Sequence, residues 1–570
     1  MATHETLHNV YGPGTFADTS FIPLPKDCPR ILDWLAHETP GFTKGVEALQ
    51  DVNWQGHDLP LLPGPLKAQA LSAALHAMAG IVGKEIAAMR GTDVGKITID
   101  IDQAGMYPAS TSLVSINGKT GMDMVKDGTF FKLGTDLDHG ALTKNPWHLR
   151  SWSIYPTKAP EVHYQIMSNM DAPRYLKAFG LDSEAPVEDN KEAYDIMRSV
   201  FSQYSARELD QKNMEHGFCG QTCYNPQQWR ETEMGKRLAA HPLVNYRRVP
   251  GTADIPATPF LTIPSDPRPL AGIRVVELAR AIAAPALGAV LASFGAEVVK
   301  VQSPRLPDPN PLQLTLTAGK YTYPLDLNQN TDRARLWKLL EDADVFLQGF
   351  RPRSLERKGF GLDNVLELAK RRAKGIVYLD LSCYGPDGTY LERPGYQQIA
   401  DSASGASYVF GKAYGFPEGT AVLPSLPVAD MLGGLVGAVE VMMALRDRAE
   451  HGGSYHCHAA LTAVDTIQLV EEMGCYPPEV VKKIQEVHKF GPQTPDLHVE
   501  ELLFAVYEAW KKNSDLLDCE TYFAHFADSP FGKDHVTLAP IVRYEEQAAS
   551  PYWKHSPVPY LHQAEVRWAT

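Results

Sequence analysis

Apolar and polar positions alternate in blocks after residue 270, where short apolar runs are separated by amphipathic stretches. Runs such as GIRVVEL (272–278) and GIVYLDLS (375–382) lack the polar alternation of a half-exposed strand. Apolar strands separated by helices are typical of a parallel sheet that is buried on both faces. The pattern predicts strands at 272–278, 296–302, 344–350 and 375–382, and helices at 285–295, 331–343 and 362–372. We therefore predict a doubly wound, Rossmann-like α/β unit.

The turn after the first predicted strand reads ARAIAAP (279–285) and lacks the G-x-G-x-x-G fingerprint. A nicotinamide-dependent dehydrogenase is therefore disfavoured. Pro285 suits the first turn of the helix that follows. The free N–H groups at that helix start can attract a phosphate, or the turn can simply pack on the sheet. The pattern alone leaves both roles open.

The pattern of apolar and small residues changes near residue 428. The stretch PVADMLGGLVGAVEVMMALRDRAEHGG predicts one long helix whose small residues permit close packing. A strand (GGSYHCHAA) and a further helix (LTAVDTIQLVEEMG) follow. The stretch 66–102 repeats the order of small-residue helix, basic glycine-containing turn and strand. Two further pairs of segments resemble one another, 194–211 with 502–519 and 224–248 with 544–568. Repeats of this length indicate a duplication.

These differences in residue pattern divide the chain into five segments. The stretch 251–269 holds five prolines, which predicts an extended linker. We expect the outer segments to be smaller α/β or α+β units, the first a degenerate copy of the last. The segments are an arm (1–60) with a short helix near 29–37, the degenerate copy (61–250), the linker (251–269), the Rossmann-like unit (270–425) and the last segment (426–570).

Composition and charge exclude several classes of function for this protein. The 570 residues include 54 basic and 68 acidic ones, a formal net charge of −14, which argues against a nucleic-acid binder that needs a basic face. No stretch reads as apolar over the length of a membrane span. The first residues, MATHETLHNV, lack a secretory signal, and seven scattered cysteines indicate a reduced protein. We expect a cytoplasmic protein that binds neither nucleic acid nor membrane.

Asp430 is the strongest candidate for chemistry. It stands in SLPVADMLGG, between an apolar turn and the long helix. An Asp at this point favours helix capping, by about 1 kcal/mol over Ala, and from the pattern alone capping is the favoured role. A carboxylate here, beside the flexible pair Gly433 and Gly434, can also attack an acyl thioester. In the degenerate copy the matching position falls near Lys67, without a carboxylate, so we expect that copy to be structural.

Three other groups have a functional and a structural interpretation. His456 and His458 lie two apart, so a strand places them on one face, but no further metal ligands can be assigned from the sequence. Cys219 and Cys223 have a spacing that fits neither a zinc knuckle nor a redox pair, and we expect no metal site. The aromatic cluster in NPWHLRSWSIYP, which contains Trp147, Trp152 and Tyr155, can line a pocket, although core packing is favoured.

Several motifs resemble class III coenzyme A transferases, the CaiB/BaiF family, in the right order. PLAGIRVVELARAIAAPALGAVLASFGAEVVKVQSP (269–304) is similar to the family's opening strand, Pro-started helix and second strand. GKYTYPLDL (319–327) resembles its Lys-containing third strand, and ADVFLQGFRPRSLERKGFG (343–361) its FRPG segment. GYQQIADSASG (395–405) and PVADMLGGLVGAVEVMMAL (427–445) complete the series.

The resemblance implies an interlocked homodimer, coenzyme A bound at the α/β unit, an acyl-CoA donor, a carboxylic acid acceptor and no metal. It implies that Asp430 is the nucleophile, which forms a mixed anhydride and then an aspartyl-CoA thioester. The family's cofactor-contacting residues fall on Arg280, Ile282, Ala283 and Ala284. Arg351 falls on the Arg of FRPG and is expected to meet a phosphate or to form a surface ion pair.

Three departures from the family pattern bear on the reaction. Tyr396 and Gln397, which we place in the cofactor site, stand where the racemase branch carries a His–Asp pair. A racemase needs a base on each face of the α-carbon, so transfer is favoured over racemisation. Gln397 also replaces an acidic residue of formyl-CoA transferases, and the family's glycine-rich loop has no clear match. A racemase or epimerase and an inactive scaffold are the alternative functions.

Overall fold

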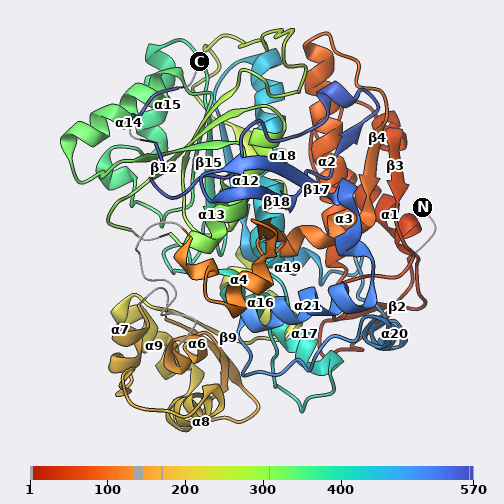
Figure 1. Ribbon diagram of the computed structural model, residues 1–570, viewed down its shortest axis with the longest axis vertical. Helices are drawn as coiled ribbons and strands as arrows, with labels where there is room; N and C mark the ends of the chain where they lie inside the picture. Colours follow the sequence, from red (N-terminus) through yellow and green to blue (C-terminus); the bar gives the residue numbers. More distant parts are fainter. Residues whose placement is uncertain (1–3, 134–144, 169–170, 307, 564, 569–570) are drawn as a thin grey trace.

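The computed structural model describes residues 4–133, 145–168, 171–306, 308–563 and 565–568 (Figure 1). A seven-stranded sheet lies at its centre, in the order β10-β16-β15-β14-β11-β12-β13. All neighbours in this sheet are parallel except β10, which runs antiparallel to β16. The strands are β10 (Tyr246–Arg248), β11 (Arg274–Leu278), β12 (Glu297–Gln302), β13 (Lys320–Pro324), β14 (Val345–Gln348), β15 (Val377–Ser382) and β16 (Tyr455–Ala460). The predicted mixed α/β fold with a parallel sheet is confirmed.

Helices cover both faces of this sheet. Successive strand residues point to opposite faces, so Val275 belongs to the core that contains α12 and α18, and Val276 to a second core with α14 and α15. This explains why the strands read as unbroken apolar runs. The four helices are α12 (Ala283–Ser293), α14 (Asn330–Asp342), α15 (Leu362–Arg371) and α18 (Val428–His451). The strands and helices predicted between residues 272 and 382 are all present, with ends shifted by a few residues.

Two predicted helices have different lengths in the structure. The helix expected near 29–37 begins earlier, as α1 (Leu24–Glu38). The helix expected at 461–474 ends at Ile467, as α19 (Leu461–Ile467). The guanidinium of Arg30 donates to the carbonyl oxygens of Glu472 and Met473. These carbonyl groups therefore accept hydrogen bonds from a side chain of the N-terminal arm, at positions where the sequence predicted a continuing helix.

The N-terminal and C-terminal segments share smaller sheets. Strands β5 (Val114–Ile116) and β6 (Lys119–Thr120) join the hairpin β17 (Phe523–Ser529) and β18 (Gly532–Leu538), and β10 adds to the central sheet. A third sheet combines β3 (Val52–Gln55), β4 (Ile97–Asp100) and β19 (Arg543–Tyr544). Backbone hydrogen bonds therefore cross the segment boundaries at 250 and 425, and the division into five segments stays a prediction about the sequence.

The stretch around 66–102 does form the helix and strand that its likeness to the 430–460 stretch predicts. Helix α2 (Ala68–Met89), β4 and α3 (Ile101–Met106) follow the same order as α18, β16 and α19. Helices α2 and α18 lie side by side (Figure 1), joined by an ion pair between Arg446 and Glu85. Lys67, at the position matched to Asp430, is fully buried and paired with Asp18 and Asp27 of the arm. The duplication itself stays a prediction.

A lobe drawn in gold in Figure 1 extends below the central sheet and contains an aromatic core. It holds Trp147 and Tyr155, which confirms core packing for these two residues. Its elements are α6 (Pro146–Arg150), β7 (Ile154–Pro156), β8 (His163–Met167), α7 (Ala172–Ala178), α8 (Asn190–Phe201), α9 (Ala206–His216) and β9 (Cys219–Thr222).

The remaining helices and paired strands connect these parts. They are β1 (Thr6–His8), β2 (Phe16–Asp18), α4 (Gly121–Lys126), α10 (Pro226–Glu231), α11 (Glu233–Leu238), α13 (Asn310–Leu316), α16 (Gln397–Ser404), α17 (Ala406–Ala413), α20 (Pro478–His488) and α21 (Val499–Asn513).

Helix α18 is long and apolar enough to cross a membrane by length and composition alone. The expectation that no stretch reaches this length was therefore wrong for α18. Its apolar residues serve packing, since 94% of its most apolar window is buried inside the protein. Small residues let its backbone approach α12 closely, because a methyl group on Gly434 would overlap the carbonyl oxygen of Ala283 and lie 3.0 Å from the Leu287 nitrogen.

Substitution Gly434→Ala is expected to destabilise the fold by about 1–3 kcal/mol, because the added methyl group meets backbone atoms that cannot yield. Gly433→Ala is the matched control, since its methyl group would meet only side chains, at 3.1 Å from Leu461 and 3.9 Å from Val464. Urea unfolding of both variants measures the difference. Equal losses for the two variants would show that the contact between α12 and α18 is not tight.

Candidate active site

A cavity of about 190 Å³ lies where three parts of the chain meet. The central unit contributes Ile282, Tyr396 and Gln397, and α18 contributes Asp430. Other lining residues come from the N-terminal segment, for example Trp152, and from the start of α21, for example Phe504. This central cavity is smaller than the roughly 300–1,000 Å³ of sites for drug-sized ligands. It therefore suits one end of a large ligand.

Asp430 is the third residue of α18, and the helix cap is Pro427, so the capping role expected from the pattern is wrong. Its side chain is only 8% exposed. Burial raises the pKa of its carboxyl group to about 7. Within the described part of the chain, no hydrogen bond occupies either carboxylate oxygen. The group is thus held in the cavity wall while both of its oxygens stay available for reaction.

The backbone of Asp430 is fixed by Gln397. The Asp430 N–H donates to the Gln397 side-chain oxygen at 2.7 Å, and the amide nitrogen of Gln397 donates to Asp401 at 2.7 Å. Asp401 in turn hydrogen-bonds Asp465, and burial together with this pairing raises the pKa of Asp401 well above its usual value. Burial likewise raises the pKa of Asp465. Because Asp401 takes the NH₂ group, the amide oxygen of Gln397 must face Asp430.

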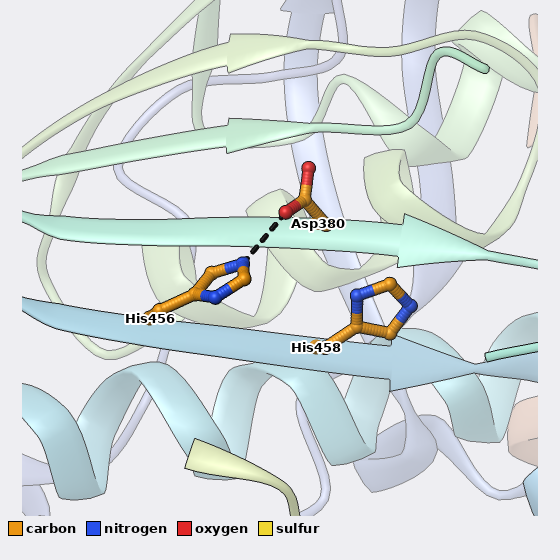
Figure 2. Close-up of side chains that lie close together, drawn as sticks. All are labelled: Asp380, His456 and His458. Atoms are coloured by element: carbon orange, nitrogen blue, oxygen red, sulfur yellow. Dashed lines mark hydrogen bonds and ion pairs between the residues drawn. The ribbon is translucent and has the colours of Figure 1, made fainter. Parts of the chain in front are cut away.

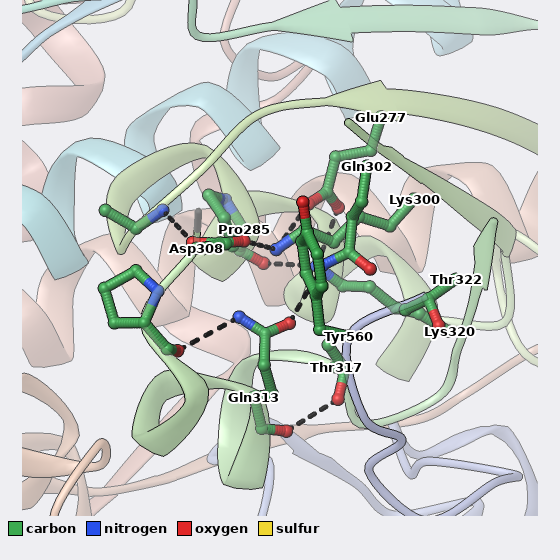
Figure 3. Close-up of polar contacts among 12 residues, drawn as sticks. Glu277, Pro285, Lys300, Gln302, Asp308, Gln313, Thr317, Lys320, Thr322 and Tyr560 are labelled. Carbon is green, nitrogen blue, oxygen red and sulfur yellow. Dashed lines mark hydrogen bonds and ion pairs between the residues drawn. The ribbon is translucent and has the colours of Figure 1, made fainter. Parts of the chain in front are cut away.

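The loop between β11 and α12 forms another part of the wall. Ala281 has a positive φ of 63°, which is uncommon outside glycine. Its N–H donates to the Asp308 carboxylate at 2.8 Å, and the other Asp308 oxygen lies 2.9 Å from the Lys300 ammonium (Figure 3). Asp308 and Lys300 are both fully buried. A buried ion pair therefore holds the strained turn in place.

A second ion pair lies beside the first one. The Lys320 ammonium donates to Glu277 at 2.7 Å and to the carbonyl oxygen of Pro285 at 2.6 Å (Figure 3). Burial lowers the pKa of Lys320 to about 8 and raises the pKa of Glu277. Lys300 lies 3.9 Å from Glu277, which joins the two pairs into one charge cluster. This cluster (Glu277, Lys300, Asp308 and Lys320) lies beneath the loop and the first turn of α12.

Among the described residues, four helices of eight or more residues begin at the central cavity. They are α12, α16, α18 and α21, and each contributes residues of its cap or first turn to the lining. Helix N-termini carry partial positive charge and unpaired N–H groups. In the described part of the chain, no Lys or Arg lines the cavity. Helix starts therefore supply the favourable potential for an anion there.

Comparisons with known proteins identify the family. Residues 270–505 match the model of CoA-transferase family III. An "Acyl-CoA transferase" of Gibberella moniliformis is 46% identical over 564 residues, which cover 98% of each chain. The chain belongs to CoA-transferase family III. The "Acetyl-coenzyme A transferase nodX" of Hypoxylon pulicicidum is 30% identical over 517 residues. This alignment covers 88% of this chain and 86% of the relative.

A solved CAIB/BAIF family protein from Brucella suis aligns with a TM-score of 0.32 and 24% identity over 40% of this chain and 59% of that one. Membership makes the protein a CoA-transferase, as the sequence motifs predicted. Coenzyme A thioesters and carboxylic acids as substrates are consistent with this family.

The structure brings together only part of the predicted site of this transferase. Ile282 and Tyr396 line the cavity, as do Gln397 and Asp430, and burial raises the pKa of Tyr396 to about 12. Ala283 and Ala284 are buried in the first turn of α12, outside the cavity lining, because the tight contact between α12 and α18 uses this turn.

The two predicted arginines lie outside the cavity lining. Arg280 is half-buried, and its charge lowers the pKa of Tyr396 and Tyr560, although burial dominates and raises both. Arg351 is exposed and donates to the carbonyl oxygen of Gly217 at 3.4 Å. They follow the ends of β11 and β14, which are neighbouring parallel strands. The arginines therefore lie at one edge of the sheet.

Sequence reasoning missed several residues of the site. Asp401 stands four residues after Gln397, a spacing that places both on one helix face, and this signal could have been used. Asp308 gave no signal, since it lies between a strand and a short helix. His148 and Glu500 also line the cavity and come from segments far apart in the sequence.

His456 and His458 lie on one face of β16, as predicted, and Asp380 of β15 joins them (Figure 2). Their ligand atoms all lie within 4.8 Å, so the group can hold a metal ion by proximity. His456 already contacts Asp380 at 2.7 Å, and His458 contacts Ser382 at 2.9 Å. The group lies away from the cavity lining, and a metal-free enzyme stays a prediction. Separately, Cys219 and Cys223 are buried free thiols.

Substitution Asp308→Asn is expected to destabilise the transferase by about 3–5 kcal/mol, because the buried Lys300 ammonium loses its close partner. The Michaelis constant for an acyl-CoA should also rise, since the Ala281 turn loses its charged acceptor. Urea unfolding and steady-state kinetics measure the two effects. Asp195→Asn, which removes exposed ion pairs with Lys191 and Arg198, is the control and should have a much smaller effect. Equal losses for the two variants would contradict the role of the cluster.

Proposed function

We propose that the protein is an acyl-CoA:carboxylate CoA-transferase that uses Asp430 as a covalent nucleophile. The observation that carries the proposal is a carboxylate in the cavity wall whose oxygens have no hydrogen-bond partner in the described residues. In the first step the carboxylate attacks the thioester carbonyl, the C–S bond breaks, and a mixed anhydride and CoA thiolate form. The thiolate then attacks the Asp430 carbonyl, which releases the donor acid and leaves an aspartyl-CoA thioester.

The second half of the reaction reverses these steps with another acid. The acceptor carboxylate attacks the aspartyl-CoA thioester, and a new mixed anhydride and CoA thiolate form. The thiolate attacks the acceptor acyl carbon, so that a new acyl-CoA leaves and the Asp430 carboxylate is restored. No proton is gained or lost over the cycle. The chemistry needs no redox cofactor.

The helix starts around the cavity support this chemistry. Each step places negative charge on a carbonyl oxygen, and N–H groups with partial positive charge stabilise that charge without reorganisation. The Gln397 amide holds the start of α18 and so fixes the direction of attack by Asp430. Burial keeps the carboxylate poorly solvated, which makes it a better nucleophile once it is ionised.

We place coenzyme A at the carboxyl ends of β11 and β14. The order of the strands reverses between these neighbours, with β12 and β13 on one side and β15 and β16 on the other, and such a point is where ligands bind in Rossmann-like, doubly wound sheets. Arg280 and Arg351 follow the two strands and are proposed to bind phosphate groups, with the thioester reaching past Ile282 into the cavity. An interlocked homodimer and a cytoplasmic location complete the proposal and rest on the family resemblance and the free cysteines.

Trapping with hydroxylamine or borohydride during incubation with acyl-CoA should modify Asp430 in the native protein, because both reagents attack the anhydride or thioester. Asp430→Asn should abolish the adduct and lower CoA exchange by at least about a thousandfold, as expected for loss of a covalent nucleophile. Peptide mass spectrometry locates the adduct. Asp528→Asn, which changes an exposed carboxylate, is the control. Exchange of the α-proton without CoA transfer would instead indicate a racemase.

The raised pKa of Asp430 should affect activity and stability in opposite directions. Activity requires the carboxylate, so kcat/KM should rise with pH with a midpoint near 7. The folded protein binds this proton more tightly than the unfolded chain, so its stability falls as pH rises from about 4 to about 7. At pH 8 Asp430→Asn should therefore be more stable than the native protein by roughly 4 kcal/mol, at about 1.4 kcal/mol per pKa unit.

Urea unfolding of both proteins from pH 4 to pH 8 measures this difference. The difference between the two stabilities should shrink as the pH falls to about 4, because the folded protein is then protonated at Asp430 and the unfolded chain begins to be protonated there as well. A difference that stays constant across this range would contradict a titrating, buried Asp430.

A further inference from the structure

Three side chains that commonly bind metal ions converge near the carboxyl ends of β15 and β16, outside the central cavity. Asp380 comes from β15, and His456 and His458 come from β16, where Asp380 is the register partner of His458 (Figure 2). One ligand atom of each residue lies within 4.8 Å of those of the other two. Cys457 stands between the histidines in the sequence and points to the opposite face of the sheet, because successive strand residues alternate. The group therefore offers nitrogen and oxygen donors.

His458 presents a lone pair to the other two residues. Burial lowers the pKa of His458 to about 4, so its ring is neutral and carries one N–H group. The Ser382 hydroxyl donates its proton to the carbonyl oxygen of Gly385, so at the 2.9 Å contact the Nε2–H of His458 must donate to Ser382. Nδ1 therefore holds the lone pair, on the side of the ring that faces Asp380 and His456 (Figure 2). Among the described residues no hydrogen bond occupies this nitrogen.

The Asp380 carboxylate is also oriented by its neighbours. The Gln348 amide donates to one of its oxygens, and the other oxygen lies 2.7 Å from Nε2 of His456. Burial alone would raise the pKa of Asp380, but contacts with the two histidines and Gln348 lower it below its usual value, so the group is ionised at neutral pH. Outer contacts of this kind, an amide on the carboxylate and a hydroxyl on the imidazole, orient the ligands of metal sites in proteins.

Two imidazoles and one carboxylate favour a first-row transition metal. Mg²⁺ and Ca²⁺ prefer oxygen ligands alone, and Cu(I) prefers sulfur. Zinc forms bonds of about 2.0–2.2 Å to nitrogen and oxygen, so the ligand atoms of a tetrahedral site lie roughly 3.3–3.6 Å apart. Small side-chain rotations convert the present spacing, which runs from 2.7 Å to at most 4.8 Å, into that arrangement. Solvent reaches the group, since the side chains of His456 and Asp380 are 15% and 24% exposed.

We propose that Asp380, His456 and His458 bind one divalent transition metal ion of the zinc type through a carboxylate oxygen and two imidazole nitrogens. The ion takes the place of the proton between His456 and Asp380, and His456 then carries its proton on Nδ1. By joining β15 to β16 the ion stabilises the central sheet. The proposal departs from the metal-free protein that the family resemblance implies. It is separate from the transferase function, whose chemistry uses Asp430 and needs no metal.

Titration of the untagged, metal-free protein with Zn²⁺ tests the site. Calorimetry should show one ion bound per chain, and free zinc at about a hundred times its Kd should raise the Tm by about 2 °C. Co²⁺ in the same site should give visible d–d absorption with nitrogen and oxygen ligands and no thiolate charge-transfer band. Absence of zinc binding, or a cobalt spectrum with thiolate bands, would overturn the proposal.

Variants locate the bound ion. His458→Gln keeps a group that can reach Ser382 but removes Nδ1, so this variant and Asp380→Asn should each lower the zinc affinity at least about a hundredfold, whereas Ser382→Ala should lower it about tenfold. His57→Gln is the matched control, because His57 also contacts a carboxylate at 2.7 Å but belongs to no group of three ligands in the described chain. Melting without zinc checks that each variant is folded, and the cobalt spectrum of the native protein tests the site without any variant. Unchanged affinity in folded His458→Gln and Asp380→Asn protein, or an equal loss in His57→Gln, would contradict the assignment.

Assays of CoA transfer separate this site from the transferase function. Removal of zinc should leave kcat/KM for transfer unchanged, and Asp430→Asn should leave the zinc affinity unchanged. If the protein transfers no CoA but binds zinc at the three residues, the proposed function fails and the metal site stands. If transfer occurs and zinc does not bind, the function stands and the metal site fails. Loss of transfer on removal of zinc would contradict a site that is separate from the chemistry.

Discussion

The close contact between α12 and α18 determines the geometry on which the site depends. Gly434 brings the backbone of α18 against the first turn of α12, where a side chain of any size would meet the Ala283 carbonyl group. Asp430 lies one helical turn before Gly434, and the loop that contains Ala281 leads directly into α12. A single packing distance therefore sets how far Asp430 lies from the loop beside it.

The charge cluster under this loop holds a geometry that is unfavourable in free energy. A positive φ at Ala281 and four fully buried ionisable side chains are each unfavourable by themselves. They persist together because Asp308 pairs with the Ala281 N–H and with Lys300, while Lys320 holds Glu277 and the Pro285 carbonyl group. The cluster therefore fixes a conformation more than it increases stability.

The cavity combines two opposing electrostatic demands. Asp430, the proposed nucleophile, is poorly solvated, and its raised pKa reflects that burial. The carbonyl oxygens of the proposed intermediates need stabilisation when they become negative. Helix N-termini are proposed to meet the second demand, and no Lys or Arg among the described lining residues pairs with the carboxylate.

The sequence by itself determined the parallel sheet, the helices on both faces and the position of Asp430, because apolar periodicity and motif order are local properties of the chain. It also placed Gln397 and Ile282 in the site through the family resemblance. Tertiary structure decided that Asp430 is not a helix cap, that Ala283 and Ala284 serve packing, and that Asp401 supports Gln397. It alone brought His148 and Glu500 to the same cavity, since they lie more than 300 residues apart in the sequence. Contacts of that range depend on how segments pack and exchange strands, and no local pattern records them.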